Sequence, residues 1–184
     1  RALKAQLASE KQQLLLALPP KTCRGQTGLL CEAHDFRVLG RNADLCVLKN
    51  ASVTLGAPSA LADIGRMNET VRYAVSEIPA KKLLCSLPAV GLQWALPWHQ
   101  GQRARPLAGA QAAEQAVQVG APVRYDEAAQ APHYNFWRGG TEQEVWFEDA
   151  RSYRAKCALA AEYRLGGVAV PEAAQWYSQL WGIL

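Results

Sequence analysis

Short apolar runs alternate along the chain with segments whose apolar residues keep helical spacing. The runs are continuous, which is typical of strands in a parallel sheet that is covered on both faces. They lie at residues 14–18, 45–48, 83–87 and 168–170. The helical patterns lie at residues 1–13, 61–78, 106–119, 149–165 and 172–181. This alternation predicts an α/β fold in which right-handed crossovers build a parallel sheet.

One segment breaks the alternation. Two aromatic runs flank the pair Gly139-Gly140, which is a pattern typical of a β-hairpin. The runs lie at residues 133–137 and 144–147, and residues 123–125 are expected to add a third strand. The predicted division is a small antiparallel α+β insertion at residues 123–147 within an α/β body formed by residues 1–122 and 148–184.

Composition narrows the range of partners. The chain has 184 residues, of which 49% are hydrophobic, and a net charge of +4 without a long run of one sign. Its densest basic stretch, residues 102–105, is interpreted as a solvated loop, so we expect no nucleic-acid partner. No apolar run approaches the roughly 18 residues of a transmembrane helix, and no membrane partner is expected. The chain begins with Arg1 instead of Met, so we expect its natural start to lie upstream.

The metal-binding residue types show no ligand spacing. The five cysteines form no C-x-x-C motif, and His34, His99 and His133 are far apart in the sequence. We therefore predict neither a metal site nor a cofactor. Cys23 and Cys31 share a loop, and the sequence leaves open whether they pair.

Seven phrases, in this order, span nearly the whole chain. They are ALPPKT (17–22), ADLCVL (43–48), VRYAVSEIPAKKLLCSLPAVGLQW (71–94), GQRARPL (101–107), VRYDEAAQAPHYNF (123–136), EVWFEDARS (144–152) and EYRLGGVAV (162–170). Together they resemble the C-terminal half of the catalytic barrel of glycoside hydrolase family 18, and above all its bacterial, spore-associated members. The resemblance implies that the four apolar runs are strands five to eight of a TIM barrel. It also implies that the antiparallel segment is the α+β insertion found after the seventh strand.

The same resemblance implies a loss of catalytic groups. The family cleaves β-1,4-linked N-acetylglucosamine glycans by substrate-assisted retention. Its sixth strand ends Met-x-Tyr-Asp, where this chain has Lys49, Asn50, Ala51 and Ser52. Its eighth strand ends in a Trp that forms the floor of the sugar site, where this chain has Pro171. The motif D-x-x-D-x-D-x-E, which carries the proton donor, is absent from these residues and would lie upstream. We therefore predict no catalytic residue in this chain and an impaired barrel.

Candidate glycan-binding residues follow from the strand ends and the insertion. Glu172 follows the last strand, although an acid there also suits the start of a helix. Trp94 and Trp98 flank Pro97 and suit either stacking on a sugar or packing in the core. A buried Lys49 would need a carboxylate partner, for which Glu172 is the prediction. The full predicted set is Gln93, Trp94, Trp98, Asp126, Tyr134, Trp137 and Glu172.

Three functions remain open at this point. The chain is a sugar-binding relative that has lost catalysis, or a part of an active glycosidase whose acid lies upstream, or a structural scaffold. The predicted ligand is a glycan of the chitin or peptidoglycan type. Four strands cannot close a barrel, so we expect the open sheet edges to pair with the missing half in the same chain or with a second copy. The resemblance implies a location at the cell envelope, in the spore or outside the cell.

Overall fold

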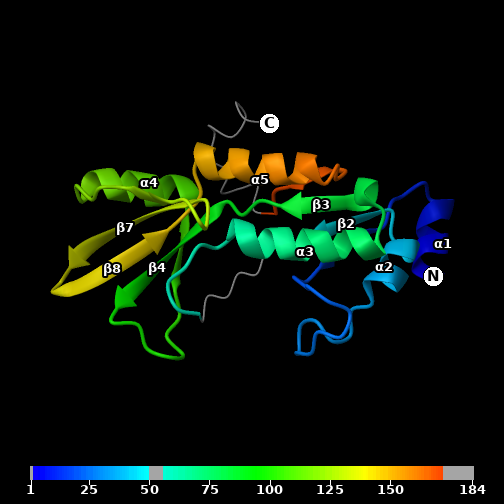
Figure 1. The fold of residues 1–184 in the computed structure, drawn as a ribbon, viewed down its shortest axis with the longest axis horizontal. Coiled ribbons are helices and arrows are strands. Elements are labelled where there is room, and N and C mark those ends of the chain that lie inside the picture. Colours follow the sequence, from blue (N-terminus) through cyan, green and yellow to red (C-terminus); the bar gives the residue numbers. More distant parts are fainter. Residues whose placement is uncertain (1, 50–55, 172–184) are drawn as a thin grey trace. The chain divides into compact units, whose positions relative to one another are not determined.

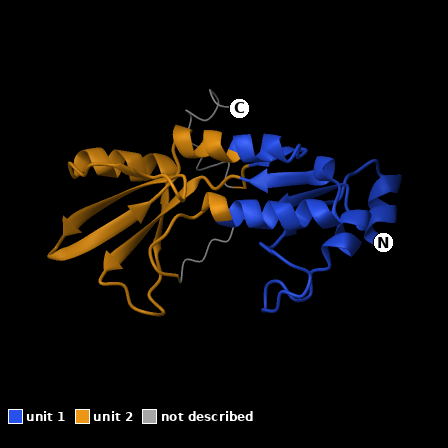
Figure 2. Cartoon of the chain, in the orientation of Figure 1, with its two compact units in different colours: residues 1–50, 66–86, 157–169 blue, residues 51–65, 87–156, 170–184 orange. Residues whose placement is uncertain are grey.

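The structure is a computed structural model, and it describes residues 2–49 and 56–171. The chain divides into two compact units (Figure 2). Unit 1 consists of residues 1–50, 66–86 and 157–169, and unit 2 of residues 51–65, 87–156 and 170–184. Each unit has its own sheet.

Unit 1 contains, among the described residues, a parallel sheet with strand order β1-β2-β3-β9 (Figure 1). Its strands are β1 (Leu15–Leu18), β2 (Leu45–Leu48), β3 (Leu83–Ser86) and β9 (Gly167–Ala169). These strands match the four apolar runs of the sequence, so the predicted parallel sheet is confirmed. Leu18 pairs with Leu48 and Leu48 with Cys85, and the carboxyl ends of these strands therefore meet at one edge.

Helices connect the strands of unit 1. They are α1 (Ala2–Ser9), α2 (Phe36–Asn42), most of α3 (Ile64–Glu77) and the 3-10 turn η1 (Ala80–Lys82). Met67, Thr70, Val71 and Ala74 are the buried residues of α3, and their spacing of three and four gives the helix a single buried side. Asp35 caps α2, because its side chain accepts a hydrogen bond from the Val38 N–H at 3.0 Å.

Unit 2 is built on an antiparallel sheet with strand order β5-β4-β8-β7-β6. The strands are β4 (Val90–Leu96), β5 (Arg105–Ala108), β6 (Arg124–Asp126), β7 (Ala131–Arg138) and β8 (Thr141–Trp146). Helix α4 (Gly109–Gln118) follows β5, and α5 (Ala150–Glu162) begins in unit 2 and ends in unit 1. The predicted hairpin is confirmed: β7 and β8 pair through a two-residue turn at Gly139 and Gly140, whose φ angles are +56° and +79°.

The antiparallel sheet begins earlier than the predicted insertion at residues 123–147. It also takes in β4 and β5, which the sequence interpretation assigned to the α/β body. Strand β4 is an interior strand of this sheet, because Gln93 pairs with Arg105 of β5 on one side and with Val145 of β8 on the other. Its main-chain groups are thus used by antiparallel neighbours on both sides.

Other predicted boundaries differ in detail. The first helix is shorter than residues 1–13 and ends at Ser9. The third begins at Gly109 instead of residue 106, since residues 105–108 pair with β4. Helix α2 has no counterpart in the predicted pattern. The expected last helix at residues 172–181 lies outside the described residues. Within residues 2–49 and 56–171, no helix combines the length and the apolar character needed to cross a bilayer.

Candidate functional site: the tryptophan face of the antiparallel sheet

The carboxyl ends of the parallel strands hold the first group of predicted site residues. Lys49 directly follows β2, and its N–H donates to the Leu18 carbonyl at 2.9 Å. The Lys49 side chain is exposed, so the burial on which the predicted carboxylate partner depended is not found, and a solvated ammonium needs no such partner. Pro171 is exposed as well. Residues 50–52 and Glu172 lie outside the described residues.

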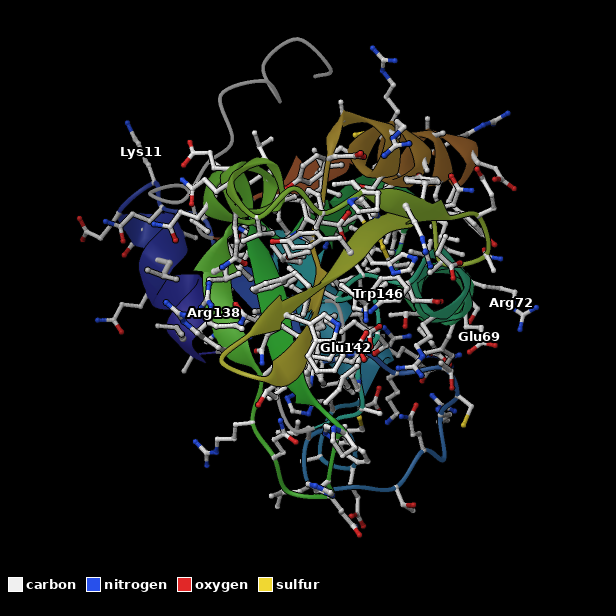
Figure 3. The ribbon with its side chains drawn as sticks, turned by 90° about the vertical axis from the view of Figure 1, so that its left-hand side faces the viewer. Lys11, Glu69, Arg72, Arg138, Glu142 and Trp146 are labelled. Atoms are coloured by element: carbon white, nitrogen blue, oxygen red, sulfur yellow. The ribbon has the colours of Figure 1, made fainter. Side chains whose placement is uncertain are left out.

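The second group converges on one face of the antiparallel sheet. Side chains alternate between the two faces of a strand, and cross-strand partners share a face. The register places three rows on the same face, namely Leu92, Trp146 and His133, then Trp94, Glu144 and Asn135, then Leu96, Glu142 and Trp137. We call these nine residues the tryptophan face. Figure 3 looks along the hairpin and shows Glu142 and Trp146 on one side of it and Arg138 on the other.

The inner row of the tryptophan face is packed, together with Trp94 of the middle row. Leu92, Trp94 and Trp146 form a core cluster with Leu61, Ala104 and small residues of the adjoining loops. Trp94 is 2% exposed, and its indole N–H donates to the Gly56 carbonyl at 2.9 Å. Trp98 is partly buried against this cluster. Trp94 is therefore a core residue. Of its two predicted roles, stacking on a sugar and packing in the core, the geometry favours packing.

The outer row is open. Trp137 is 71% exposed, and its indole ring borders a hollow of about 590 Å³. The hollow is lined by Leu96, Pro97, Trp137, Gly140, Thr141 and Glu142. Its walls therefore combine an aromatic ring, apolar carbons, a hydroxyl and a carboxylate.

Hydrogen bonds hold the polar side chains of this face in place. Glu142 Oε1 accepts from Asn135 Nδ2 at 3.0 Å. Glu144 Oε1 accepts from the Trp146 indole N–H at 2.8 Å. The His133 ring stacks on Trp146 with 4.5 Å between ring centroids and 15° between planes. Each glutamate keeps lone pairs for further donors, because a carboxylate has about four acceptor positions.

Two of the predicted residues lie on the opposite face, which α4 covers. Tyr134 is 1% exposed, and its hydroxyl is 2.8 Å from the Ala112 carbonyl and 2.9 Å from Gln115 Oε1. Burial raises the pKa of Tyr134 to about 12. Gln93 is buried and donates from Nε2 to Gln143 Oε1 at 2.8 Å. Both side chains therefore serve the interior of unit 2.

Asp126 occupies the end of β6 and pairs with Ala131 of β7. Its Oδ1 accepts from the Ala129 N–H at 2.8 Å, which closes the turn between the two strands. The carboxylate is half-buried and its second oxygen remains for another donor. Asp126 can therefore close the turn with one oxygen and bind a ligand with the other.

The sequence interpretation missed three polar residues of the tryptophan face, Asn135, Glu142 and Glu144. A usable signal was present, because a two-residue turn at Gly139-Gly140 fixes which residues face each other. With Arg138 opposite Thr141, Trp137 must lie opposite Glu142 and Asn135 opposite Glu144. The predicted set rested on the aromatic residues of the hairpin and left out the carboxylates between them.

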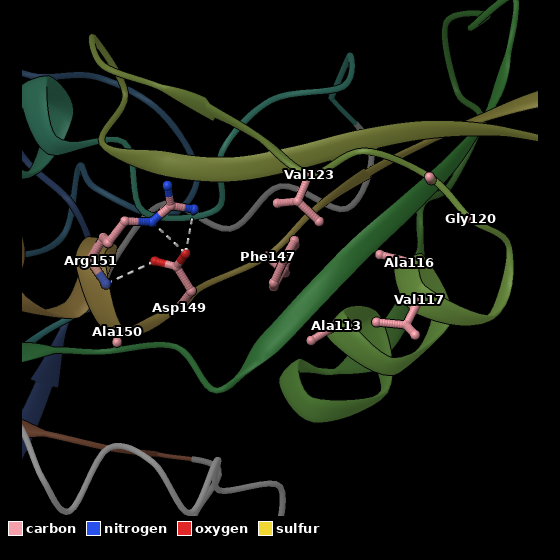
Figure 4. Close-up of a pocket in the computed structure, with 10 residues that line it drawn as sticks. Ala113, Ala116, Val117, Gly120, Val123, Phe147, Asp149, Ala150 and Arg151 are labelled. Atoms are coloured by element: carbon pink, nitrogen blue, oxygen red, sulfur yellow. Dashed lines mark hydrogen bonds and ion pairs between the residues drawn. The ribbon is translucent and has the colours of Figure 1, made fainter.

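A second hollow in unit 2 contains none of the predicted site residues. It measures about 490 Å³ and is lined mainly by small apolar side chains of α4 and of the segment that follows it (Figure 4). At one end Asp149 Oδ2 accepts from Arg151 Nε at 2.9 Å and from its Nη2 at 2.7 Å. The Arg151 guanidinium also lies 4.3 Å from the centroid of the Tyr125 ring. This cation is thus already paired and stacked within the protein.

Metal-ligating residues are dispersed in the described part of the chain. Within it, no group of three or more His, Cys, Asp or Glu side chains could hold a metal ion. The five cysteines are free thiols, so Cys23 and Cys31 do not form a disulfide.

Comparison with known proteins identifies relatives along almost the whole chain. The cortical fragment-lytic enzyme of Bacillus subtilis (strain 168) is 36% identical over 179 residues, which cover 95% of this chain and 42% of that protein. The chain thus spans about two fifths of the length of the curated relatives that it matches. No family model matches the chain.

Solved structures agree with these relatives. The spore cortex-lytic enzyme SleL of Bacillus cereus superimposes with a TM-score of 0.93 at 35% identity, covering 100% of this chain and 43% of that one. A GH18 chitinase of Cycas revoluta in complex with (GlcNAc)3 shares the fold, with a TM-score of 0.72 at 17% identity, covering 97% of this chain and 57% of that one. The predicted resemblance is thereby confirmed: the chain is a homologue of spore cortex-lytic enzymes and has the fold of a GH18 chitinase.

Proposed function

We propose that the chain is the C-terminal part of a family 18 type (β/α)8 barrel that binds β-1,4-linked N-acetylglucosamine glycans of the chitin or peptidoglycan type. Its four parallel strands would be strands five to eight, and its antiparallel sheet would be the insertion after the seventh strand. Homology to a spore cortex-lytic enzyme and to a cortical fragment-lytic enzyme supports this substrate class. The shared fold with a chitinase held in complex with (GlcNAc)3 supports it further.

The open part of the tryptophan face carries the proposal for glycan binding. A pyranose ring has an apolar face edged by hydroxyl groups, so its recognition needs a flat apolar surface beside hydrogen-bond acceptors. The Trp137 ring and the Glu142 carboxylate border the same hollow and provide both. Asn135 lies beside them, with its amide hydrogen-bonded to Glu142. Trp98 and Asp126 are further candidates at the packed end of the face and at the outer strand of the sheet.

We further propose that this half of the barrel does not supply catalysis. Stabilising the developing charge at the anomeric carbon requires positioned polar groups, and each loss costs about 10²–10³ in rate. Ala51 and Ser52 have neither the phenol nor the carboxylate that the family places at this strand end. Pro171 offers no aromatic floor, and it stands exposed after β9. Together these substitutions argue for binding without efficient hydrolysis.

Two assays on the same protein test the proposal. Isothermal titration with chitooligosaccharides is expected to show saturable binding, and a fluorogenic chitobioside is expected to show no turnover above a buffer control. Absence of binding at millimolar sugar would contradict the glycan proposal and leave the scaffold function. Turnover would contradict the proposed loss of catalysis.

An active enzyme remains the second candidate, because the chain spans only about two fifths of relatives that are themselves named as lytic enzymes. In that case an upstream half carrying the proton donor would complete the barrel by pairing with β1 and β9, the two edge strands of the described parallel sheet. Adding the natural upstream segment would then restore turnover of the chitobioside. A second copy of the chain is the other possible partner for these edges, and size-exclusion chromatography distinguishes the two.

A further inference from the structure

The hollow at the tip of the β7–β8 hairpin has the features of a binding site for a single sugar ring. Trp137 is an aromatic residue that is 71% exposed, and it lines a hollow of about 590 Å³. Small-molecule sites typically measure about 300–1,000 Å³. The turn residues Gly139 and Gly140 carry no side chain, and an added Cβ on either would meet nothing within 4 Å.

The charge of the lining selects the ligand. Glu142 is the only ionisable residue among the six that border the hollow, and no lysine or arginine is among them. A carboxylate only accepts hydrogen bonds, so it binds hydroxyl and ammonium donors and disfavours anions. One of its oxygens is oriented by Asn135 Nδ2, which fixes the direction of the remaining lone pairs. A neutral pyranose fits both the ring and the carboxylate.

The hollow is separated along the strands from the packed end of the tryptophan face. Trp137 lies four residues from His133 on β7, a separation of about 13 Å for extended chain. One sugar ring therefore cannot contact both ends of the face. A glycan chain of several rings can fill the hollow and extend beyond it, and each further contact is then made at a high effective concentration.

We propose that Trp137, Glu142 and the Leu96–Pro97 segment form a distal subsite that stacks one pyranose ring and makes glycan binding depend on chain length. This inference rests on the proposed glycan-binding function and adds a defined position and a length preference to it. The subsite increases affinity only for glycans long enough to reach it.

Calorimetric titration of chitobiose and chitohexaose into the wild-type chain and into Trp137→Ala tests the inference. The variant is expected to bind chitohexaose about fivefold to tenfold more weakly, the size of effect that one aromatic contact provides. Its affinity for chitobiose is expected to stay unchanged. Trp137→Phe keeps a ring and should recover much of the loss. Val117→Ala removes another exposed apolar side chain, on α4 and 83% exposed, and should have no effect.

A second measurement locates the contact directly. With 5-fluorotryptophan incorporated, the fluorine resonance that Trp137→Phe removes is assigned to Trp137. That resonance should shift with chitohexaose and not with chitobiose.

The outcomes separate the two proposals. Equal chitohexaose affinity in wild type and Trp137→Ala, with wild type binding normally, overturns the distal subsite alone. No binding of any sugar by wild type overturns the glycan function and the subsite with it. A sugar-independent dimer that Trp137→Ala dissociates would assign the ring to self-association, and would also overturn the subsite.

Discussion

Lys156 and Glu148 form an ion pair in the interior of unit 2, with 2.5 Å between Nζ and Oε2 and side chains that are 0% and 1% exposed. Glu148 lies two residues after the end of β8, and Lys156 lies in α5. The pair therefore joins the sheet of this unit to the helix. Lys156 Nζ also lies 3.3 Å from the Gln130 carbonyl. Burial raises the pKa of the Glu148 carboxyl, and the ammonium beside it acts in the opposite direction.

Removing one partner should destabilise the protein strongly. Lys156→Met leaves a buried carboxylate without its cation, and we expect the free energy of unfolding to fall by about 3–5 kcal/mol. Without the ammonium, the Glu148 pKa in the folded state lies still further above its unfolded value. The folded state then binds more protons, so stability is lost as pH rises, and the effect should be larger at pH 8 than at pH 5.

Urea denaturation at the two pH values measures this effect. Lys4→Met is the matched control, because the Lys4–Asp44 pair is partly exposed at 33% and 34%, and its loss should cost less than about 1 kcal/mol. The double variant Glu148→Gln with Lys156→Met should recover part of the stability. Equal losses for the buried and the exposed pair would contradict the assignment.

Tyr134 should make the protein less stable in alkali. Burial raises its pKa to about 12, whereas a tyrosine in an unfolded chain ionises near pH 10. Between these values the folded state keeps a proton that the unfolded state releases. The resulting stability is fully present below pH 10 and is lost as pH rises toward 12. Tyr134→Phe has no such proton, so the Tm difference between wild type and variant should narrow or reverse between pH 8 and pH 11. A constant difference would exclude this linkage.

The parallel sheet could be predicted because its strands are recognisable one at a time. Cys46, Leu48 and Cys85 belong to continuous apolar runs and are indeed buried. Helix α2 has only seven residues, of which Phe36 and Gly40 are buried, and so short a helix gives no periodic signal. Strand β5 is four residues long and opens an Ala-rich stretch, and it is a strand only because β4, a separate segment, pairs with it. Local pattern could not supply that partner.

The candidate site shows a similar limit. Alternation correctly assigns Trp137 to a strand of the hairpin, and the register places it on the same face as Trp94 of β4. It does not show that one is 2% exposed and the other 71%. That difference arises because loops containing Leu61 and Ala104 pack against Trp94 and the inner row and leave the outer row open. Tyr134 is the opposite case, an aromatic residue that the hairpin alone would leave exposed. It is buried because α4, a separate segment of the chain, covers it.

Gly91 should tolerate no side chain. A Cβ at this position would lie 3.0 Å from the Phe147 Cβ, 3.0 Å from the Trp146 carbonyl oxygen and 3.3 Å from the Ala112 Cβ. Two of these atoms belong to rigid parts of the sheet and helix, so the neighbours cannot move away easily. Gly91→Ala should lower the free energy of unfolding by about 1–3 kcal/mol. At Gly25 an added Cβ meets nothing within 4 Å, and Gly25→Ala should leave the urea midpoint unchanged or slightly raised.

Lys21 should hold the long loop after β1 in its folded conformation. Its side chain is 3% exposed, and Nζ donates to the Cys31 carbonyl at 3.2 Å and to the His34 carbonyl at 3.0 Å.

Lys21→Met keeps the apolar stem and removes these donors, leaving two carbonyl groups without a charged partner. Local opening of the loop should then become more frequent and expose the bond after Arg24, whose side chain is already 61% exposed. Trypsin should therefore cleave the variant at Arg24 several-fold faster than wild type, as followed by mass spectrometry. Lys11→Met, at an exposed position outside this loop, should leave the cleavage rate at Arg24 unchanged. If both variants are cut at the wild-type rate, the loop is held by other contacts and the role assigned to Lys21 is wrong.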